Sequence, residues 1–399
     1  MKQPTFRLLL TLAALGVFAN AAHAQFGLKS VLKKATDKVA GSDEAAPTKS
    51  ADATKPTVKS NGPSALPAPW PAPTEAFVVP TSIRVTASNQ GCFRPTPESD
   101  CKGTAWFPTM TFNVVGPLKK SAKLNVQWSV AGKPWFKEGI SPVELETNVG
   151  EGIETGREPK DEWAKQHVGA FEFKITADDG LAGTSKVLYE GKFKANKLHT
   201  GNSDPSYKNQ FEWYVEYDWA LPFAYLEWNV SSMEWPSLEA GFFFKVPYEK
   251  ADEYTAHLFF DGKELESTEG AESWSKENNS EFKKIRYGWS LVRFDFGRAM
   301  AHYRPVGAMS SREGFVLADH PGKYEIKVLR KGELARVASF TILPDGKMDD
   351  GLTKTNNLRG TWIVIPSKIL GKLDGKFDAN AWKTDLLWGN VPKGFAVPQ

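Results

Sequence analysis

Cysteine is scarce in this chain, which contains only Cys92 and Cys101. The eight residues between them exclude the CxxC spacing of dithiol redox sites, so we expect no redox role. Two cysteines this close in sequence can instead close a short loop in an oxidising compartment. We therefore predict a disulfide bond between Cys92 and Cys101, which would stabilise the fold by about 2 to 3 kcal/mol.

Long hydrophobic runs are also missing. No stretch reaches the roughly 20 apolar residues that a membrane-spanning helix needs. The first apolar run, residues 8–18, follows Lys2 and Arg7 and precedes the small-x-small sequence AHA. A basic start, a short apolar run and such a site are the three parts of a secretory signal peptide. We expect a cleaved signal peptide over residues 1–24, no transmembrane span, and a periplasmic or secreted protein.

The chain lacks an excess of charge of one sign. It has 50 Lys and Arg residues against 47 Asp and Glu residues, and loss of the signal peptide leaves 48 against 47, a formal net charge of +1. A nearly neutral chain offers no general electrostatic attraction for a polyanion. We therefore predict no nucleic-acid partner.

Motifs of catalysis and cofactor binding are absent from the sequence. It contains no GxSxG nucleophile elbow, no Walker phosphate loop and no HExxH zinc motif. The five histidines that follow the signal peptide show no metal-ligand spacing. We predict no catalytic residue, no metal site and no cofactor.

A basic amphipathic segment follows the predicted cleavage site. Residues 25–40 place apolar side chains at near-helical spacing with lysines on the other faces, which predicts a short helix. Residues 26–40 could make peripheral contact with a membrane, or fray in solvent as short isolated helices do. Residues 41–76 are rich in Pro, Ala, Ser, Thr and Lys, a composition that predicts a disordered linker.

Beyond residue 77 the pattern changes to that of β-strands. Aromatic and β-branched residues alternate with polar ones, for example over residues 109–115, 123–130 and 289–296, and Gly, Pro, Asn and Asp separate these runs. Helical pattern is confined to short stretches at 161–166 and near 379–387. These runs predict an all-β fold of antiparallel strands.

The sequence contains an internal repeat. Residues 167–175 (HVGAFEFKI) match residues 320–328 (HPGKYEIKV) in type at nearly every position, and the shared pattern resembles the last strands of an immunoglobulin-like β-sandwich. We predict two tandem immunoglobulin-like antiparallel β-sandwich domains, over residues 77–200 and 205–345. The second carries a polar insertion near residues 266–287.

Residues 319–324 (DHPGKY) resemble the tyrosine corner of that architecture, in which the phenol hydroxyl binds a backbone carbonyl a few residues upstream. The first copy has Phe171 in place of Tyr324, so we expect its corner to be held by packing alone. Residues 346–399 form a C-terminal extension, either an extra strand of the second domain or a strap across both domains.

An aromatic segment over residues 211–235 intersperses carboxylates with rings, as sugar-binding surfaces do. Alternate residues of this segment share one face, so the same pattern is typical of a buried core stripe. The candidate binding residues are Glu212, Trp213, Tyr214, Glu216, Tyr217, Trp219, Trp228 and Trp235.

These observations predict an exported, non-catalytic binding or envelope-associated protein that presents its aromatic-rich surface to a glycan or protein partner. One alternative is an exported hydrolase of the glycosidase type, whose carboxylate pair would lie between the domains and come from Glu212, Glu216 or Asp218. Another is a structural envelope protein held near a membrane by residues 26–40.

Overall fold

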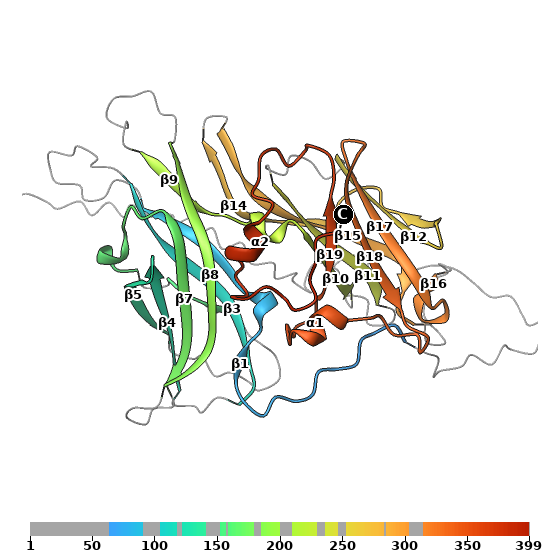
Figure 1. The fold of residues 1–399 in the computed structure, drawn as a ribbon, viewed down its shortest axis with the longest axis horizontal. Coiled ribbons are helices and arrows are strands. Elements are labelled where there is room, and N and C mark those ends of the chain that lie inside the picture. The colour runs from blue at the N-terminus through green and yellow to red at the C-terminus, as the bar shows by residue number, and fades with distance from the viewer. Residues whose placement is uncertain are drawn as a thin grey trace, which may run out of the picture. The chain divides into compact units, whose positions relative to one another are not determined.

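β-Strands dominate the computed structural model, and the prediction of an all-β fold is confirmed (Figure 1). The chain divides into two units, Met1–Thr57 and Val58–Gln399. The predicted signal peptide, the predicted helix of residues 25–40 and both cysteines lie outside the described residues. The structure describes residues 64–90, 104–117, 122–140, 152–156, 159–178, 185–199, 210–229, 236–245, 253–282, 285–302 and 314–398.

Two antiparallel sheets make up the first part of the described chain. A four-stranded sheet has the order β1-β3-β2, with β6 also paired to β3, and a five-stranded sheet has the order β5-β4-β7-β8-β9. The strands are β1 (Phe77–Val78), β2 (Arg84–Gln90), β3 (Ala105–Val115), β4 (Lys123–Val130), β5 (Lys133–Ile140), β6 (Gly152–Glu154), β7 (Gly169–Asp178), β8 (Ser185–His199) and β9 (Phe211–Val215).

A single ten-stranded sheet contains the remaining strands. Its order is β13-β12-β17-β18-β19-β10-β11-β15-β14, and β16 pairs with β15 in the only parallel register among the described strands. The strands are β10 (Phe223–Asn229), β11 (Ser237–Lys245), β12 (Tyr254–Phe260), β13 (Lys263–Ser267), β14 (Ser273–Phe282), β15 (Ile285–Met300), β16 (Phe315–Val316), β17 (Gly322–Arg330), β18 (Glu333–Ile342) and β19 (Ile363–Ile369).

The strand order of the first part recurs in the second. The series β2-β3-β6 corresponds to β10-β11-β15, and β5-β4-β7-β8 corresponds to β13-β12-β17-β18. One further strand is then added at the same place in each copy, because β9 pairs with β8 and β19 pairs with β18. The matching sequences of the internal repeat fall on the equivalent strands β7 and β17 and on the turns before them.

The predicted insertion near residues 266–287 contains β14, which pairs with the outer edge of β15. In the first copy no described strand lies beyond β6, the counterpart of β15. The additional residues of the second copy therefore form an added edge strand.

The corner of the second copy has the expected hydrogen bond. The Tyr324 hydroxyl donates to the His320 carbonyl oxygen at 2.8 Å. In the first copy the expectation of packing alone is wrong, because Trp106 of β3 donates its indole N–H to the equivalent carbonyl oxygen, that of His167, at 2.8 Å. The Trp106 ring also packs edge-on against Phe171, 5.3 Å between centroids. A neighbouring strand thus supplies the donor that Phe171 lacks.

The three strands β10, β11 and β15 are covered on both faces. Along β10, Phe223 and Tyr225 join the core of the first part, whereas Ala224 and Leu226 join the core of the second. Successive side chains of a strand point to opposite faces, so a strand buried on both sides has a nearly continuous apolar sequence. The GFFF run within β11 is explained in this way.

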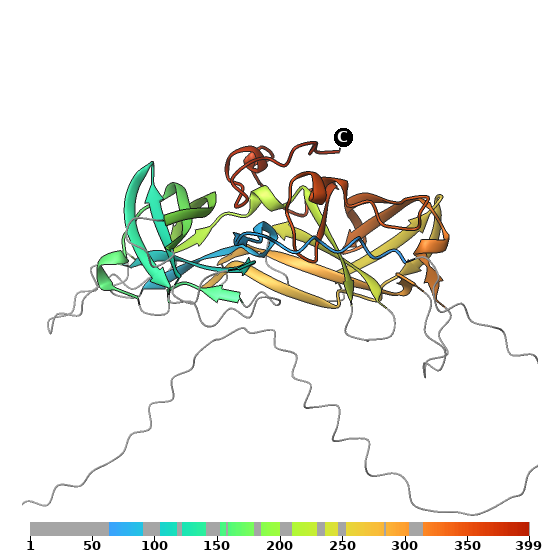
Figure 2. The same cartoon turned by 90° about the horizontal axis from the view of Figure 1, so that it is seen from below.

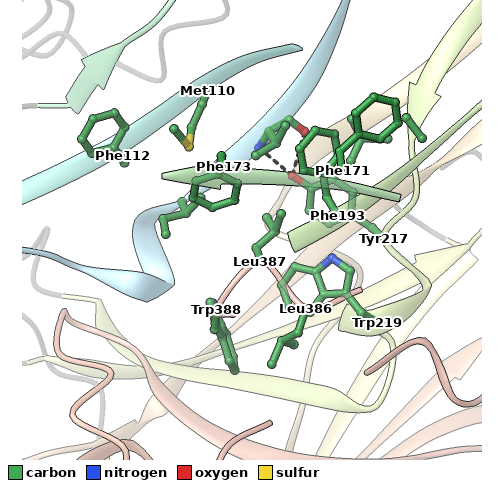
Figure 3. Close-up of a cluster of buried hydrophobic side chains, with 14 of the residues drawn as sticks. Met110, Phe112, Phe171, Phe173, Phe193, Tyr217, Trp219, Leu386, Leu387 and Trp388 are labelled. Atoms are coloured by element: carbon green, nitrogen blue, oxygen red, sulfur yellow. Dashed lines mark hydrogen bonds between the residues drawn. The ribbon is translucent and has the colours of Figure 1, made fainter. Parts of the chain in front are cut away.

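The C-terminal extension supplies an extra strand and also crosses to the first part of the fold, so it combines the two alternatives predicted for it. Its strand β19 is hydrogen-bonded to β18 on one side and to β10 on the other. The chain then passes to β8, where Leu386, Leu387 and Trp388 pack near Phe173 and Trp219 (Figure 3). Gly191 permits this approach, because a Cβ there would overlap the Phe173 ring and the Leu387 carbonyl oxygen.

The predicted linker extends too far at its C-terminal end. Ala65 is fully buried, donates its N–H to the Ala301 carbonyl oxygen at 2.8 Å and accepts a hydrogen bond from the Met348 N–H at 3.2 Å. From this anchor the segment, blue in Figure 2, continues to β1. Residues 64–76 are therefore part of the folded unit, although their composition is that of a tether.

Helices are few and short in the described residues. The predicted helix at 161–166 is a 3-10 turn, and the stretch near 379–387 contains only α2. No helix of the described chain is long and apolar enough to cross a membrane. The helices are α1 (Gly351–Thr355), α2 (Ala381–Thr384) and the 3-10 helices Pro80–Ser82, Asp161–Trp163, Asp218–Ala220 and Leu317–Asp319.

Candidate functional site

The rings of the aromatic segment point into the core. Trp213 and Trp219 are each 2% exposed, Tyr217 is 0% exposed and Trp228 is 8% exposed. Tyr214 is also buried, and Trp235 lies outside the described residues. Buried rings cannot stack on a ligand in solvent, so these five residues serve packing rather than an exposed binding face.

The position of β9 explains this burial. Strand β9 pairs with β8 on one side. The Asn89 side chain of β2 also donates to the Trp213 carbonyl oxygen at 2.9 Å and accepts from the Trp213 N–H at 2.7 Å. Two residues past the strand, the Tyr217 hydroxyl both accepts from the Val85 N–H and donates to the Val85 carbonyl oxygen, each at 3.0 Å. The aromatic segment thus closes the gap between β8 and β2.

Two of the three carboxylates of the hydrolase alternative, Asp218 and Glu216, have separate partners. Asp218 is buried and accepts hydrogen bonds from Lys245 Nζ, the Trp289 indole and the Asp378 N–H. Glu216 lies 3.3 Å from Lys194 Nζ.

Glu212 and Glu216 are four residues apart along and just beyond β9, which places their Cα atoms about 13 Å apart in extended chain. A glycosidase pair needs its carboxyl groups about 5 to 10 Å apart, so the backbone does not favour these two as such a pair. Burial raises the pKa of Glu212, and no second carboxyl is among the causes of that shift.

A different set of acids is brought together by strand register. Glu227 of β10 lies opposite Glu239 of β11, which in turn lies opposite Asp295 of β15. Burial raises the pKa of Glu239; Arg293 opposes the rise, and Glu227 and Asp295 add to it. No local sequence pattern indicates this acidic row, because its members belong to three strands whose register only the folded sheet defines.

Each acid of the row has partners within the protein. Glu227 accepts from the Thr361 hydroxyl at 2.7 Å and from the Trp362 indole at 2.6 Å. Arg293 Nη1 lies 3.3 Å from Glu239 Oε1, and Asp295 accepts from the Ser237 hydroxyl at 2.7 Å. Hydrogen bonds and ion pairs from the protein itself thus offset the repulsion between like charges on neighbouring strands. Such an arrangement is typical of a structural network.

A cavity of about 270 Å³ lies where the C-terminal extension meets the first part of the fold. Strands β1 and β8 contribute to its walls, together with the residues after α1 and those after Leu387. The lining residues are Phe77, Val78, Pro80, Leu188, Tyr189, Asn356, Asn357, Leu358, Trp388, Asn390, Val391 and Pro392.

The aromatic walls of this cavity are fixed by packing. Trp388 packs against Trp219 and Phe223, with ring centroids 5.6 Å and 5.1 Å away. The Phe77 ring is covered on one side by the Arg359 guanidinium, 4.2 Å from its centroid. Burial raises the pKa of Tyr189, so its hydroxyl stays protonated and able to donate a hydrogen bond. The cavity is therefore preformed.

The polar groups of the cavity differ in whether the protein already uses them. Asn356 is fully engaged, donating to the carbonyl oxygens of Leu352 and Lys393 and accepting from the Lys393 N–H. The Asn357 side chain accepts from Arg359 Nε at 2.8 Å through its oxygen. No described residue makes a hydrogen bond with the Asn357 amide nitrogen, the Asn390 side chain or the Tyr189 hydroxyl, so these groups can serve a ligand.

The cavity has no charged lining residue, and among the described residues no group of three or more His, Cys, Asp or Glu side chains could hold a metal ion. No sequence motif marks this site, because its walls come from four segments that are separated along the chain. The tryptophans of the C-terminal extension were the one signal available.

Comparisons of the chain with family models, with curated proteins and with solved structures find no match in any of the three.

Proposed function

We propose that this chain is an exported, non-catalytic glycan-binding protein, and that the cavity beside Trp388 is its binding site. The observation that carries the proposal is the composition of the cavity wall. Aromatic rings stand beside side-chain amides, and charged residues are absent from the lining. Ring faces pack against the apolar faces of sugars, while amides and a phenol exchange hydrogen bonds with sugar substituents.

The size of the cavity suits this ligand. At about 270 Å³ it lies just below the range of small-molecule sites, which occupy about 300 to 1,000 Å³. We expect it to hold one or two sugar rings of a longer glycan, the remainder of which would lie in solvent.

The architecture we propose is a pair of immunoglobulin-like units. Their strand order supports this, because the series β2-β3-β6 and β5-β4-β7-β8 of the first part recur as β10-β11-β15 and β13-β12-β17-β18 within the ten-stranded sheet. The Tyr324 hydrogen bond of the corner supports it further. Such units hold loops and extensions rigidly, so a site can be built at their margin.

The predicted signal peptide supports a role outside the cytoplasm. Residues 1–24 have the three parts of a signal peptide, and a Cys92–Cys101 disulfide would form in an oxidising compartment. We propose a periplasmic or secreted location. N-terminal sequencing of the protein from cell fractions tests cleavage after Ala24, and mass measurement with and without a reductant tests the disulfide.

Peripheral membrane contact through residues 26–40 is a further part of the proposal. The lysines of this segment would face anionic headgroups while its apolar side chains enter the interface. Deletion of residues 26–40 should move the protein from the membrane pool to the soluble pool. Unchanged fractionation after the deletion would remove this part of the proposal.

Glycan binding is tested directly by isothermal titration of the purified protein with soluble oligosaccharides and by pull-down on insoluble polysaccharides. The informative variants are Asn390→Ala and Tyr189→Phe, which remove polar groups that the fold does not use. Both should weaken binding without changing stability. Asn380→Ala, an exposed asparagine of the same C-terminal segment outside the cavity lining, is the matched control. Binding that neither cavity variant affects would exclude this cavity as the site.

A further inference from the structure

The cavity restricts the charge of its ligand. Three charged residues, Glu190, Arg359 and Lys393, lie next to lining residues in sequence, and none of them lines the cavity. Arg359 packs over the rings of Trp70 and Phe77, at 5.5 Å and 4.2 Å from their centroids, Glu190 is paired with Lys174 at 2.6 Å, and Lys393 is exposed. A charged ligand group in the cavity would lose water without gaining a partner of opposite charge among the lining residues. The ligand should therefore be neutral where it enters the cavity.

The lining of the cavity also favours a ligand that carries an apolar group beside a polar one. Val78, Leu358 and Val391 line the cavity together with two prolines, whereas the available polar groups are few. A sugar that carries only hydroxyl groups would bury some of them against these apolar side chains, at a cost in free energy. A methyl group at the same place would lose nothing and would fill the space.

The available polar groups match an amide. The Asn357 amide nitrogen can donate to a carbonyl oxygen, the Tyr189 hydroxyl can do the same, and the Asn390 side chain can both donate and accept. An acetamido substituent combines a methyl group, one N–H donor and one carbonyl acceptor. On the basis of the proposed glycan-binding function, we infer that the ligand of this cavity is a neutral N-acetylated amino sugar, held through its acetamido group.

The pH dependence of binding follows from the same groups. Asparagine side chains do not titrate, and burial raises the pKa of Tyr189 above its ordinary value of 10.0. None of the three polar groups changes its charge between about pH 5 and 9. Affinity for the N-acetylated sugar should stay constant over this range.

The test compares four oligosaccharides of the same length and linkage by isothermal titration with the purified protein: β-1,4-linked tetramers of N-acetylglucosamine, glucosamine, glucose and glucuronic acid. We expect the N-acetylated tetramer to bind at least about tenfold more tightly than each of the others. The Asn390→Ala variant should bring its affinity close to that of the glucose tetramer, and Asn380→Ala should leave it unchanged.

Three results would overturn the inference in different ways. Equal binding of the N-acetylated and glucose tetramers, both weakened by Asn390→Ala, would refute recognition of the acetamido group while the glycan-binding function stands. Failure of all four tetramers and of a wider panel of neutral glycans to bind would refute the proposed function itself. Tighter binding of the glucosamine or glucuronic acid tetramer would refute the argument from the uncharged lining.

Discussion

A buried ion pair anchors the C-terminal extension, and its removal should destabilise the protein strongly. Arg336 of β18 is 0% exposed, and its Nη1 donates to Asp374 Oδ2 at 2.6 Å. The other oxygen of Asp374 accepts from the Lys245 N–H at 2.8 Å. Arg336 also donates to the Phe243 carbonyl oxygen at 2.8 Å. The pair therefore joins the extension to β11 and β18 at once.

Replacement of Asp374 by alanine leaves the Arg336 guanidinium buried without a counter-charge. Loss of one partner of a buried pair costs about 3 to 5 kcal/mol, mainly because the remaining charge stays desolvated. Asp374→Asn should cost less than Asp374→Ala, since the amide oxygen can still accept from Lys245. Urea denaturation followed by tryptophan fluorescence and by far-ultraviolet circular dichroism measures the difference.

An exposed pair supplies the contrast. Lys327 and Glu325 lie 2.9 Å apart with side chains 37% and 40% exposed, so Lys327→Ala should cost no more than about 1 kcal/mol. Added salt should reduce that small effect and leave the effect of Asp374→Ala unchanged, because buried pairs are poorly screened. A loss below 1 kcal/mol for Asp374→Ala would refute the claim that this pair anchors the extension.

Three further substitutions test other parts of the fold. Gly191→Ala should destabilise by about 1 to 3 kcal/mol in urea denaturation, because its Cβ would displace the Leu387 backbone. Tyr324→Phe should cost about 1 kcal/mol in the same assay, since it removes the hydrogen bond to His320. Burial raises the pKa of Glu138, so ionisation weakens the folded state as pH rises through that pKa. Glu138→Gln should therefore gain stability relative to the natural protein between pH 4 and pH 7, and a constant difference would contradict this.

Local patterns were readable from the sequence because side-chain direction in a strand is a local property. In β7 the buried residues Phe171, Phe173 and Ile175 alternate with exposed ones, as the period of two predicts. The Tyr324 hydrogen bond was equally accessible, since donor and acceptor are four residues apart. The sequence by itself thus determined the all-β class, the run of strands and one corner.

Tertiary structure decided what covers each face. Alternation places Trp213 and Tyr217 on one side of their segment, yet only the position of β9 between β8 and β2 makes that side interior. The donor for the first corner comes from Trp106, a residue 61 positions from its acceptor. No local sequence pattern predicts either contact, because both depend on which strands become neighbours.

The candidate site also depends on tertiary structure. Its walls are drawn from β1, β8 and two segments of the C-terminal extension, and they meet because Gly191 lets the extension pass close over β8. The sequence shows the rings and amides of these segments but not their convergence. The physical reason is that a cavity is a property of the packing between segments, whereas a sequence pattern describes one segment at a time.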